Sequence, residues 1–202
     1  MNRRGPHHRS DAVLETIVAG ILDRYASLSG WQPRLPVPIE DILEVVYDLH
    51  ILWDEIDEQP GEQILGALVP SRRTVVMNER HLAGRLARMG PTNFTFAHEL
   101  GHWLFDAGDP NQGELFTDDV PVFCRGADDH DRDAVIRERN CDRFAARMLL
   151  PARLLDLDEL GFMNGDEIRD RARVWGVSTQ TLEIRIGELT GPTAGPRSGR
   201  LL

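Results

Sequence analysis

The chain of 202 residues contains no lysine and only two cysteines. Two cysteines are too few for a disulfide scaffold, so we interpret Cys124 and Cys141 as reduced, ordinary small side chains. All 23 basic residues are arginines, and they do not gather into a basic stripe, so this bias reflects codon usage rather than function. The net charge of −10 opposes nonspecific attraction to nucleic acid, and we expect no direct nucleic-acid partner.

Long apolar runs are also missing. No run approaches the length of a membrane-spanning helix, and residues 1–10 lack the apolar centre of a signal peptide. We therefore expect a cytoplasmic protein without a membrane partner. Residues 1–10 and 191–202 are rich in Gly, Pro and Arg, which predicts disordered tails. Between them, residues 11–190 are long enough to form a single domain with a core of its own.

Residues 98–102 read His-Glu-Leu-Gly-His, and they carry the strongest chemical signal in the chain. Positions i and i+4 lie above one another on a helix, so His98 and His102 can offer ring nitrogens to the same metal ion. Glu99 then points at a neighbouring angle, toward a metal-bound water. This spacing is typical of zinc hydrolases, in which such a glutamate is the general base.

The surroundings of this motif favour a helix. Thr92 follows Pro91 and can cap the helix. Gly101 costs about 1 kcal/mol relative to alanine inside a helix, so its presence predicts the close approach of another backbone. Apolar residues recur at intervals of three and four as a buried stripe: Phe94, Ala97, Leu100, Gly101 and Leu104.

A catalytic zinc needs three protein ligands and an open position, so the two histidines are one ligand short. Residues 131–150 are predicted to form a second helix, ended by Pro151. Glu138 and Asp142 share the face of this helix that turns toward the core. Glu138 is the leading third ligand, because a metal would compensate the cost of burying its charge. Asp142, one turn later, is placed to accept the free ring N–H of a ligating histidine.

Other third ligands remain open. The metzincin pattern fails, because it requires a glycine at position 105 and a histidine at position 108, where the chain has Phe105 and Gly108. A calcium-binding loop at 129–140 also fails, because it lacks the glycine and the final glutamate. The lower-ranked candidates are His130, Cys124, Asp128, Asp129, Asp131 and Asp133. The aspartates have a simpler interpretation, as negative charge near a helix N-terminus.

The remaining patterns predict an α+β fold that is mainly helical. Apolar periodicity indicates helices over 11–29 and 38–47, and short apolar runs at 49–56, 64–69 and 74–77 indicate a small antiparallel sheet of about three strands. Residues 106–131 form a long polar connection. Residues 166–190 predict a helical hairpin that resembles a helix-turn-helix and packs on the domain.

Two segments carry a family resemblance. Phe-Thr-Phe-Ala-His-Glu-Leu-Gly-His-Trp-Leu-Phe at 94–105, with Glu-Arg-Asn-Cys-Asp-Arg-Phe-Ala-Ala-Arg-Met-Leu-Leu-Pro at 138–151, resembles the ImmA/IrrE family of bacterial zinc metallopeptidases, which belong with the gluzincins. The resemblance covers roughly residues 15–190. It implies a zincin-like fold with one Zn²⁺ per chain on His98, His102 and Glu138, and Glu99 as the catalytic base.

The resemblance also implies a substrate class. Family members typically cleave a helix-turn-helix repressor at a specific site, which derepresses stress-response or mobile-element genes. The sequence departs from the family at Cys141 and Asp142, where members often carry Ala-Asn, and an aspartate accepts a histidine N–H at least as well. Many members also carry a separate DNA-binding domain, which we do not expect in this sequence, and this argues against a direct role at an operator.

The tetrahedral oxyanion of peptide hydrolysis needs a further donor, for which His130, Tyr47 or an arginine of the long connection are candidates. The alternative function is a non-catalytic, zinc-bearing regulatory module that binds a repressor, a toxin or DNA. DNA binding would use the C-terminal hairpin, whose second helix has Glu183 and Glu188 with only Arg185 as a basic residue. This acidic setting favours packing within the peptidase fold over DNA contact.

Overall fold

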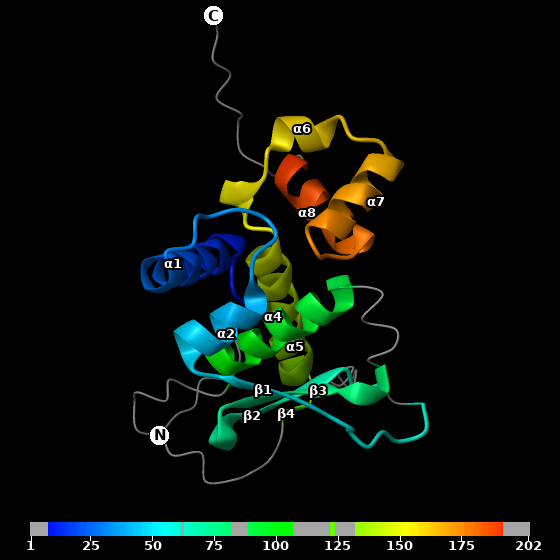
Figure 1. The fold of residues 1–202 in the computed structure, drawn as a ribbon. Helices are drawn as coiled ribbons and strands as arrows, with labels where there is room; N and C mark the ends of the chain where they lie inside the picture. Colours follow the sequence, from blue (N-terminus) through cyan, green and yellow to red (C-terminus); the bar gives the residue numbers. More distant parts are fainter. Residues whose placement is uncertain (1–7, 62, 82–88, 107–121, 124–131, 192–202) are drawn as a thin grey trace, which may run out of the picture.

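The structure of the protein is a computed structural model that describes residues 8–61, 63–81, 89–106, 122–123 and 132–191. The sheet lies at one end, α1, α2, α4 and α5 lie in the middle, and the C-terminal helices lie at the other end (Figure 1). The helices are α1 (Asp11–Ser29), α2 (Ile39–Tyr47), α4 (Met89–Phe105), α5 (Arg132–Leu149), α6 (Leu157–Gly161), α7 (Gly165–Val174) and α8 (Thr179–Thr190). The strands are β1 (His50–Asp54), β2 (Gly66–Val69), β3 (Thr74–Asn78) and β4 (Val122–Phe123).

The predicted α+β class is confirmed, and so are the helices at 11–29, 38–47 and 131–150, each to within a residue or two. The short α6 was not predicted. The motif helix α4 begins at Met89 rather than at Thr92, so the prediction of a Thr92 cap is wrong. Pro91 is the third residue of the helix, where a backbone N–H would have no intrahelical partner, so the proline is tolerated there.

The sheet is mixed rather than purely antiparallel, with the strand order β1-β3-β2-β4. β3 runs antiparallel to β2 but parallel to β1, with Leu52 opposite Val76. The antiparallel prediction is wrong because β3 inserts between the two strands that precede it, so β1 and β2 are not neighbours. β4 adds a fourth strand from within 106–131, a segment that the sequence predicts only as a long polar connection.

The sheet and the helices meet at α4. A Cβ atom on Gly66 would lie 2.8 Å from the Thr95 Cγ2 atom, so only glycine lets β2 approach α4 this closely. Trp53 of β1 packs edge-on against Phe96, with the ring centroids 6.2 Å apart. Because α4 is covered on its sheet side and its helix side, most of its residues are buried, polar ones included.

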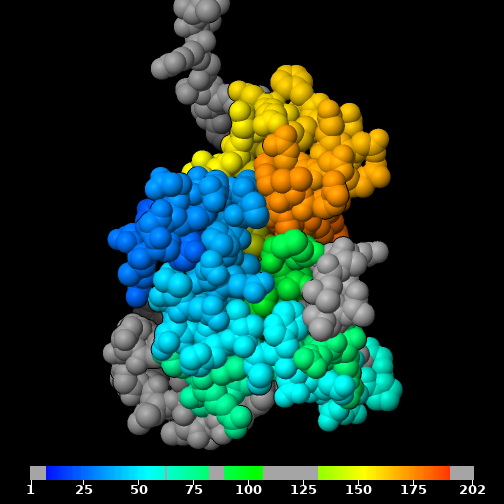
Figure 2. Space-filling model, in the orientation of Figure 1, coloured from blue at the N-terminus to red at the C-terminus, as the bar shows by residue number. Residues whose placement is uncertain are grey.

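The α7–α8 hairpin docks on the first turns of α4. The Asn93 Nδ2 atom donates to the Gly176 carbonyl at 2.9 Å, and Gly176 has φ +65°, which favours glycine. A Cβ on Gly90 would lie 2.5 Å from the Val177 carbonyl carbon, so the turn between the two helices rests on the α4 backbone. Figure 2 shows the start of α4, in green, at the surface next to the orange hairpin.

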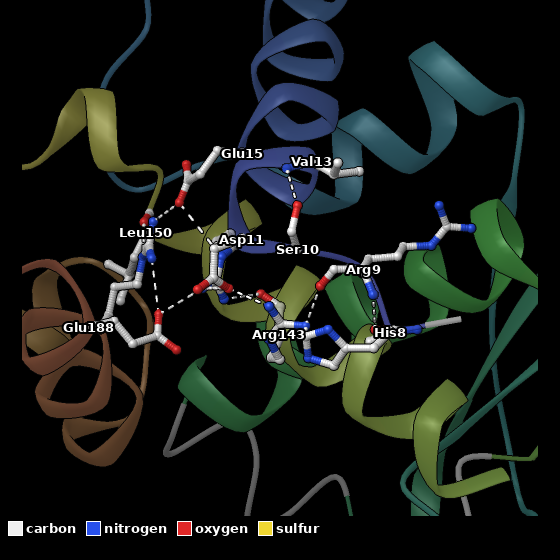
Figure 3. Close-up of polar contacts among 12 residues, drawn as sticks. His8, Arg9, Ser10, Asp11, Val13, Glu15, Arg143, Leu150 and Glu188 are labelled. Atoms are coloured by element: carbon white, nitrogen blue, oxygen red, sulfur yellow. Dashed lines mark hydrogen bonds and ion pairs between the residues drawn. The ribbon is translucent and has the colours of Figure 1, made fainter. Parts of the chain in front are cut away.

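A cluster of charged residues joins α1, α5 and α8 (Figure 3). Arg147 and Arg185 are each only 1% exposed. Arg185 donates to the Leu150 carbonyl at 3.0 Å, to Glu188 at 3.0 Å, and to Glu15. Arg147 pairs with Glu188 at 3.1 Å and with Asp11. Each buried guanidinium therefore has carboxylate partners, as a buried charge requires.

The N-terminal residues that precede α1 also make defined contacts. Ser10 caps α1 by accepting from the Val13 N–H, and the Arg9 N–H donates to the Asn140 side chain at 3.1 Å. The Arg9 guanidinium lies over the Phe105 ring, 4.2 Å from its centroid. In the part of the chain that the structure describes, no helix has the length and apolar character needed to cross a membrane.

Replacing Arg185 by alanine should lower the free energy of unfolding by about 3 kcal/mol, because it removes one of the two buried guanidinium groups that pair with Glu15 and Glu188 and leaves only Arg147 to compensate them. Urea unfolding followed by circular dichroism measures this loss. Arg169→Ala is the matched control, because the Arg169–Asp166 pair is exposed and should contribute less than about 1 kcal/mol. Equal losses in the two variants would show that the buried cluster does not hold α8 in place.

Candidate metal centre

The site lies beside a close approach of α4 and α5. A Cβ on Gly101 would lie 3.1 Å from the Cα atom of Cys141, so a larger residue there would push the helices apart. The prediction that Gly101 marks a close backbone approach is confirmed, and the approaching backbone is that of α5. Because of this contact, the side chains one turn from Gly101 and Cys141 can meet across the helix pair.

Three side chains meet there. The Nε2 atoms of His98 and His102 are 3.0 Å apart. The Glu138 Oε2 atom lies 3.2 Å from the His98 Nε2, and the Glu138 Oε1 atom lies 3.5 Å from the His102 Nε2. The structure therefore brings together the three residues that the sequence analysis proposed as metal ligands, two from α4 and one from α5.

The arrangement fits a zinc ion. Four ligands placed tetrahedrally at zinc–nitrogen and zinc–oxygen distances of 2.0–2.2 Å have donor atoms about 3.3 Å apart. The three measured separations of 3.0, 3.2 and 3.5 Å bracket this value. The histidine side chains are 5% and 2% exposed and Glu138 is 23% exposed, so the site opens to solvent on the Glu138 side. An open side is what a catalytic zinc needs for water or substrate.

Glu138 is ionised in this setting. Burial raises the pKa of Glu138, but the hydrogen bonds and charges of His102 and His98 outweigh that effect and lower the pKa to about 2. A carboxylate must be deprotonated to bind a metal. Glu138 is therefore ready to act as a ligand throughout the physiological pH range.

Each histidine is held from behind by a carboxylate. The Asp142 Oδ1 atom lies 2.9 Å from the His98 Nδ1, and the Asp106 Oδ2 atom lies 2.6 Å from the His102 Nδ1. A hydrogen bond from the Nδ1–H to a carboxylate fixes the ring and leaves the Nε2 lone pair for the metal. Asp142 makes the contact with a ligating histidine that the sequence predicts, although its side chain is 55% exposed rather than turned into the core.

Asp106 was missed by the sequence analysis, which treated it as the first residue of the long connection. It directly follows α4 and is one turn beyond His102, the i, i+4 spacing that brings side chains together on a helix. That spacing was the signal that could have found it.

Cys141 is the alternative third donor, since one donor atom from each of His98, His102 and Cys141 lies within 4.8 Å of the others. The Cys141 Sγ atom, however, lies 3.6 Å from the Nδ1 of His102, on the side of the ring that faces Asp106. Burial raises the pKa of the Cys141 thiol, which disfavours the thiolate that would bind a metal. The geometry therefore favours Glu138 over Cys141.

The structure says less about the other candidate site residues. Glu99 is fully buried on α4, next to His98. Tyr47 is half-buried at the end of α2, burial raises its pKa to about 12, and its carbonyl accepts from Arg73; no contact in the described structure joins it to the histidines. Asp133 is exposed in the first turn of α5. Outside the described residues lie His130, Cys124, Asp128, Asp129 and Asp131.

A mainly helical α+β domain, with two histidines from one helix and a glutamate from the next around one point, is characteristic of a zincin-like domain. The family model Peptidase_M78, described as the IrrE N-terminal-like domain, matches residues 66–187, more than half of the chain. The chain belongs to this family. The match runs from β2 through the metal centre and into α8. A comparison with curated proteins found no match.

Glu138→Ala should lose most of its bound zinc, because a direct ligand is removed. Its zinc affinity should fall by more than the roughly 10–100-fold that is typical when only a hydrogen-bonding partner of a ligand is lost. Cys141→Ala should keep one zinc per chain. Elemental analysis after dialysis against zinc, beside the wild type, measures both variants. Zinc lost from Cys141→Ala and kept by Glu138→Ala would make the cysteine the third ligand.

Asp106→Asn and Asp142→Asn should each lower zinc affinity by about 10–100-fold, because each loosens one histidine ring without removing a ligand. Competition with a chromogenic chelator measures the affinities. Asp133→Asn, an exposed change in the same helix as Asp142, should leave affinity unchanged. If Asp106→Asn and Asp142→Asn both bind zinc with the affinity of the wild type, these carboxylates do not support the histidines.

Proposed function

We propose that this protein is a zinc-dependent endopeptidase. The observation that supports it best is the convergence of the His98 and His102 Nε2 atoms and the Glu138 carboxylate within 3.0–3.5 Å of one another, with Glu99 beside His98 on the same helix. Zinc in this position would lower the pKa of a bound water to about 7 and polarise a peptide carbonyl. The donor set of two imidazoles and one carboxylate is that of hydrolytic zinc sites.

The protein's own groups then have distinct tasks. Glu99 takes the proton of the attacking water and returns it to the leaving amine, the role of a general base that becomes a general acid. Asp106 and Asp142 keep the two imidazoles in place during this exchange, through the hydrogen bonds at 2.6 and 2.9 Å. His130 and Tyr47 remain candidates for the oxyanion donor. The raised pKa of Tyr47 keeps its phenol protonated, as such a donor requires.

The proposed substrate is a helix-turn-helix transcriptional repressor, or an antitoxin-like regulator, cut at a specific site so that stress or mobile-element genes are derepressed. Family membership supports this substrate class. Charge supports it as well, because a DNA-binding repressor presents a basic surface and the chain carries a net charge of −10. Such a substrate places the activity in the cytoplasm.

The structure gives less support to the alternative function, DNA binding through the C-terminal hairpin. Arg185, the basic residue of α8, is 1% exposed and engaged with Glu15 and Glu188, so it does not reach a phosphate. A regulatory module that binds its partner without cutting it remains the alternative, and it differs from the peptidase in one measurable respect. Its function would not depend on Glu99.

Glu99→Gln should retain one zinc and lose cleavage by about 10²–10⁴-fold, because the general base is removed and the ligands stay. The assay incubates zinc-loaded protein with purified helix-turn-helix repressors from the same genome and identifies fragments by mass spectrometry. Glu183→Gln, an exposed change on α8, is the control and should cleave like the wild type. If the wild type and Glu99→Gln bind a repressor equally well and neither cleaves it, the protein is the non-catalytic module instead.

A further inference from the structure

A groove of about 460 Å³ lies between α4, α5 and α8 and is bordered by Leu65, just before β2. Its volume falls in the range of about 300–1,000 Å³ typical of ligand pockets, so at least one large side chain fits in it. Apolar side chains form most of its surface, chiefly Phe94, Ala146 and Ile184, and Thr95 and Thr181 also line it. Ile184 is 53% exposed, although it is a large apolar residue.

The groove lies beside the metal centre, because it shares with it two residues that contact His98. Asp142 lines it, and the same carboxylate accepts the hydrogen bond from the His98 Nδ1 at 2.9 Å. Phe94 also lines it, one helical turn before His98, and the centroids of these two rings are 6.4 Å apart. A polypeptide held at the metal centre therefore has the groove within about one helical turn of its scissile bond.

The walls of the groove are held in place before any ligand binds. The hydrogen bond from Asn93 to Gly176 and the contact of Gly90 with Val177 fix the hairpin against α4. Arg185 fixes α8 against α1 and the end of α5, through Glu15 and the Leu150 carbonyl. A preformed site costs little ordering on binding, which suits recognition of an extended peptide.

The charges at the border do not favour an acidic ligand. Arg143 lines the groove but donates to Asp11 and to the Arg9 carbonyl, so its charge is already compensated. Glu188 also lines it, and pairs with Arg185 and Arg147. Asp142 adds a negative charge. The groove therefore presents apolar surface to its occupant, with a weakly acidic border.

We propose that this groove is the specificity subsite of the peptidase, and that it receives a large apolar side chain of the polypeptide substrate one or two residues from the scissile bond. The proposal rests on the proposed endopeptidase function. One helical turn, about 5.4 Å, separates the groove residues from the metal ligands along α4 and α5. An extended peptide advances about 3.4 Å per residue, so the occupant lies one or two residues from the bond that is cut.

The test combines cleavage with binding. Zinc-loaded wild type, Ile184→Glu and Val45→Glu are incubated with a peptide library made by digesting a bacterial proteome, and the cut sites are mapped by mass spectrometry. Val45 is the matched control, because it is 50% exposed on α2, away from the groove. Binding is followed separately in zinc-loaded Glu99→Gln, through the labelled methyl group of Ile184, during titration with capped peptides that differ only in a phenylalanine or a serine.

The proposal expects a large apolar residue to be enriched at one position within two residues of the cut in wild type and Val45→Glu. Ile184→Glu should reduce this enrichment at least fivefold. The phenylalanine peptide should shift the Ile184 methyl signal more than the serine peptide does. Cleavage without apolar preference, or with the same preference in Ile184→Glu, would overturn the subsite and leave the endopeptidase standing.

A wild type that holds zinc but cuts no peptide or repressor would remove the endopeptidase function. In that case the methyl titration alone tests whether the groove binds apolar side chains. No difference between the phenylalanine and serine peptides would overturn apolar recognition as well. A selective shift would support the groove as an apolar peptide site on a protein that does not cut.

Discussion

The contact between α4 and α5 at Gly101 and Cys141 is the constraint on which the rest of the site depends. Two histidines on one helix can present two ring nitrogens, but they cannot surround a metal by themselves. The third donor must come from a neighbouring helix, and it reaches the same point only when the two backbones approach closely. A glycine on α4 and a small cysteine on α5 make that approach possible, so packing sets the geometry of the metal centre.

The other elements keep this helix pair in register. The sheet covers one side of α4 through the close contact of Gly66 with Thr95. The hairpin covers the first turns of α4 through Asn93, and the buried arginines tie α8 to α1 and α5. The charged cluster therefore acts at a distance from the chemistry, since it positions α8, which forms one wall of the apolar groove beside the metal centre.

Much of the site could be predicted from local spacing. His98 and His102 follow from the helical period, and Glu138 follows from the cost of leaving a carboxylate on an apolar helix face without a partner. Asp106 escaped the sequence analysis because it was assigned to a loop, although α4 extends far enough for the i, i+4 rule to apply. Gly101 was interpreted correctly because a glycine inside a helix has a known cost, which only a close contact offsets.

The sheet was harder to predict, for a physical reason. Apolar alternation marks a segment as a strand but does not name its neighbour, so the parallel pairing of β1 with β3 could not be deduced from the sequence. β4 pairs through two residues only, too short a segment for any periodicity to show. The start of α4 at Met89 was missed because a proline suggests a boundary, whereas the first turn of a helix accepts it.

The division of the three donors between two helices has a consequence for the whole molecule. A metal ion bound by Glu138 and the two histidines would also join α5 to α4, so it would act as a cross-link in the core. A ligand bound only by the folded state adds about 2.7 kcal/mol of stability at one hundred times its dissociation constant. The supply of metal in the cell would then govern how long the folded chain persists, as well as whether it can act.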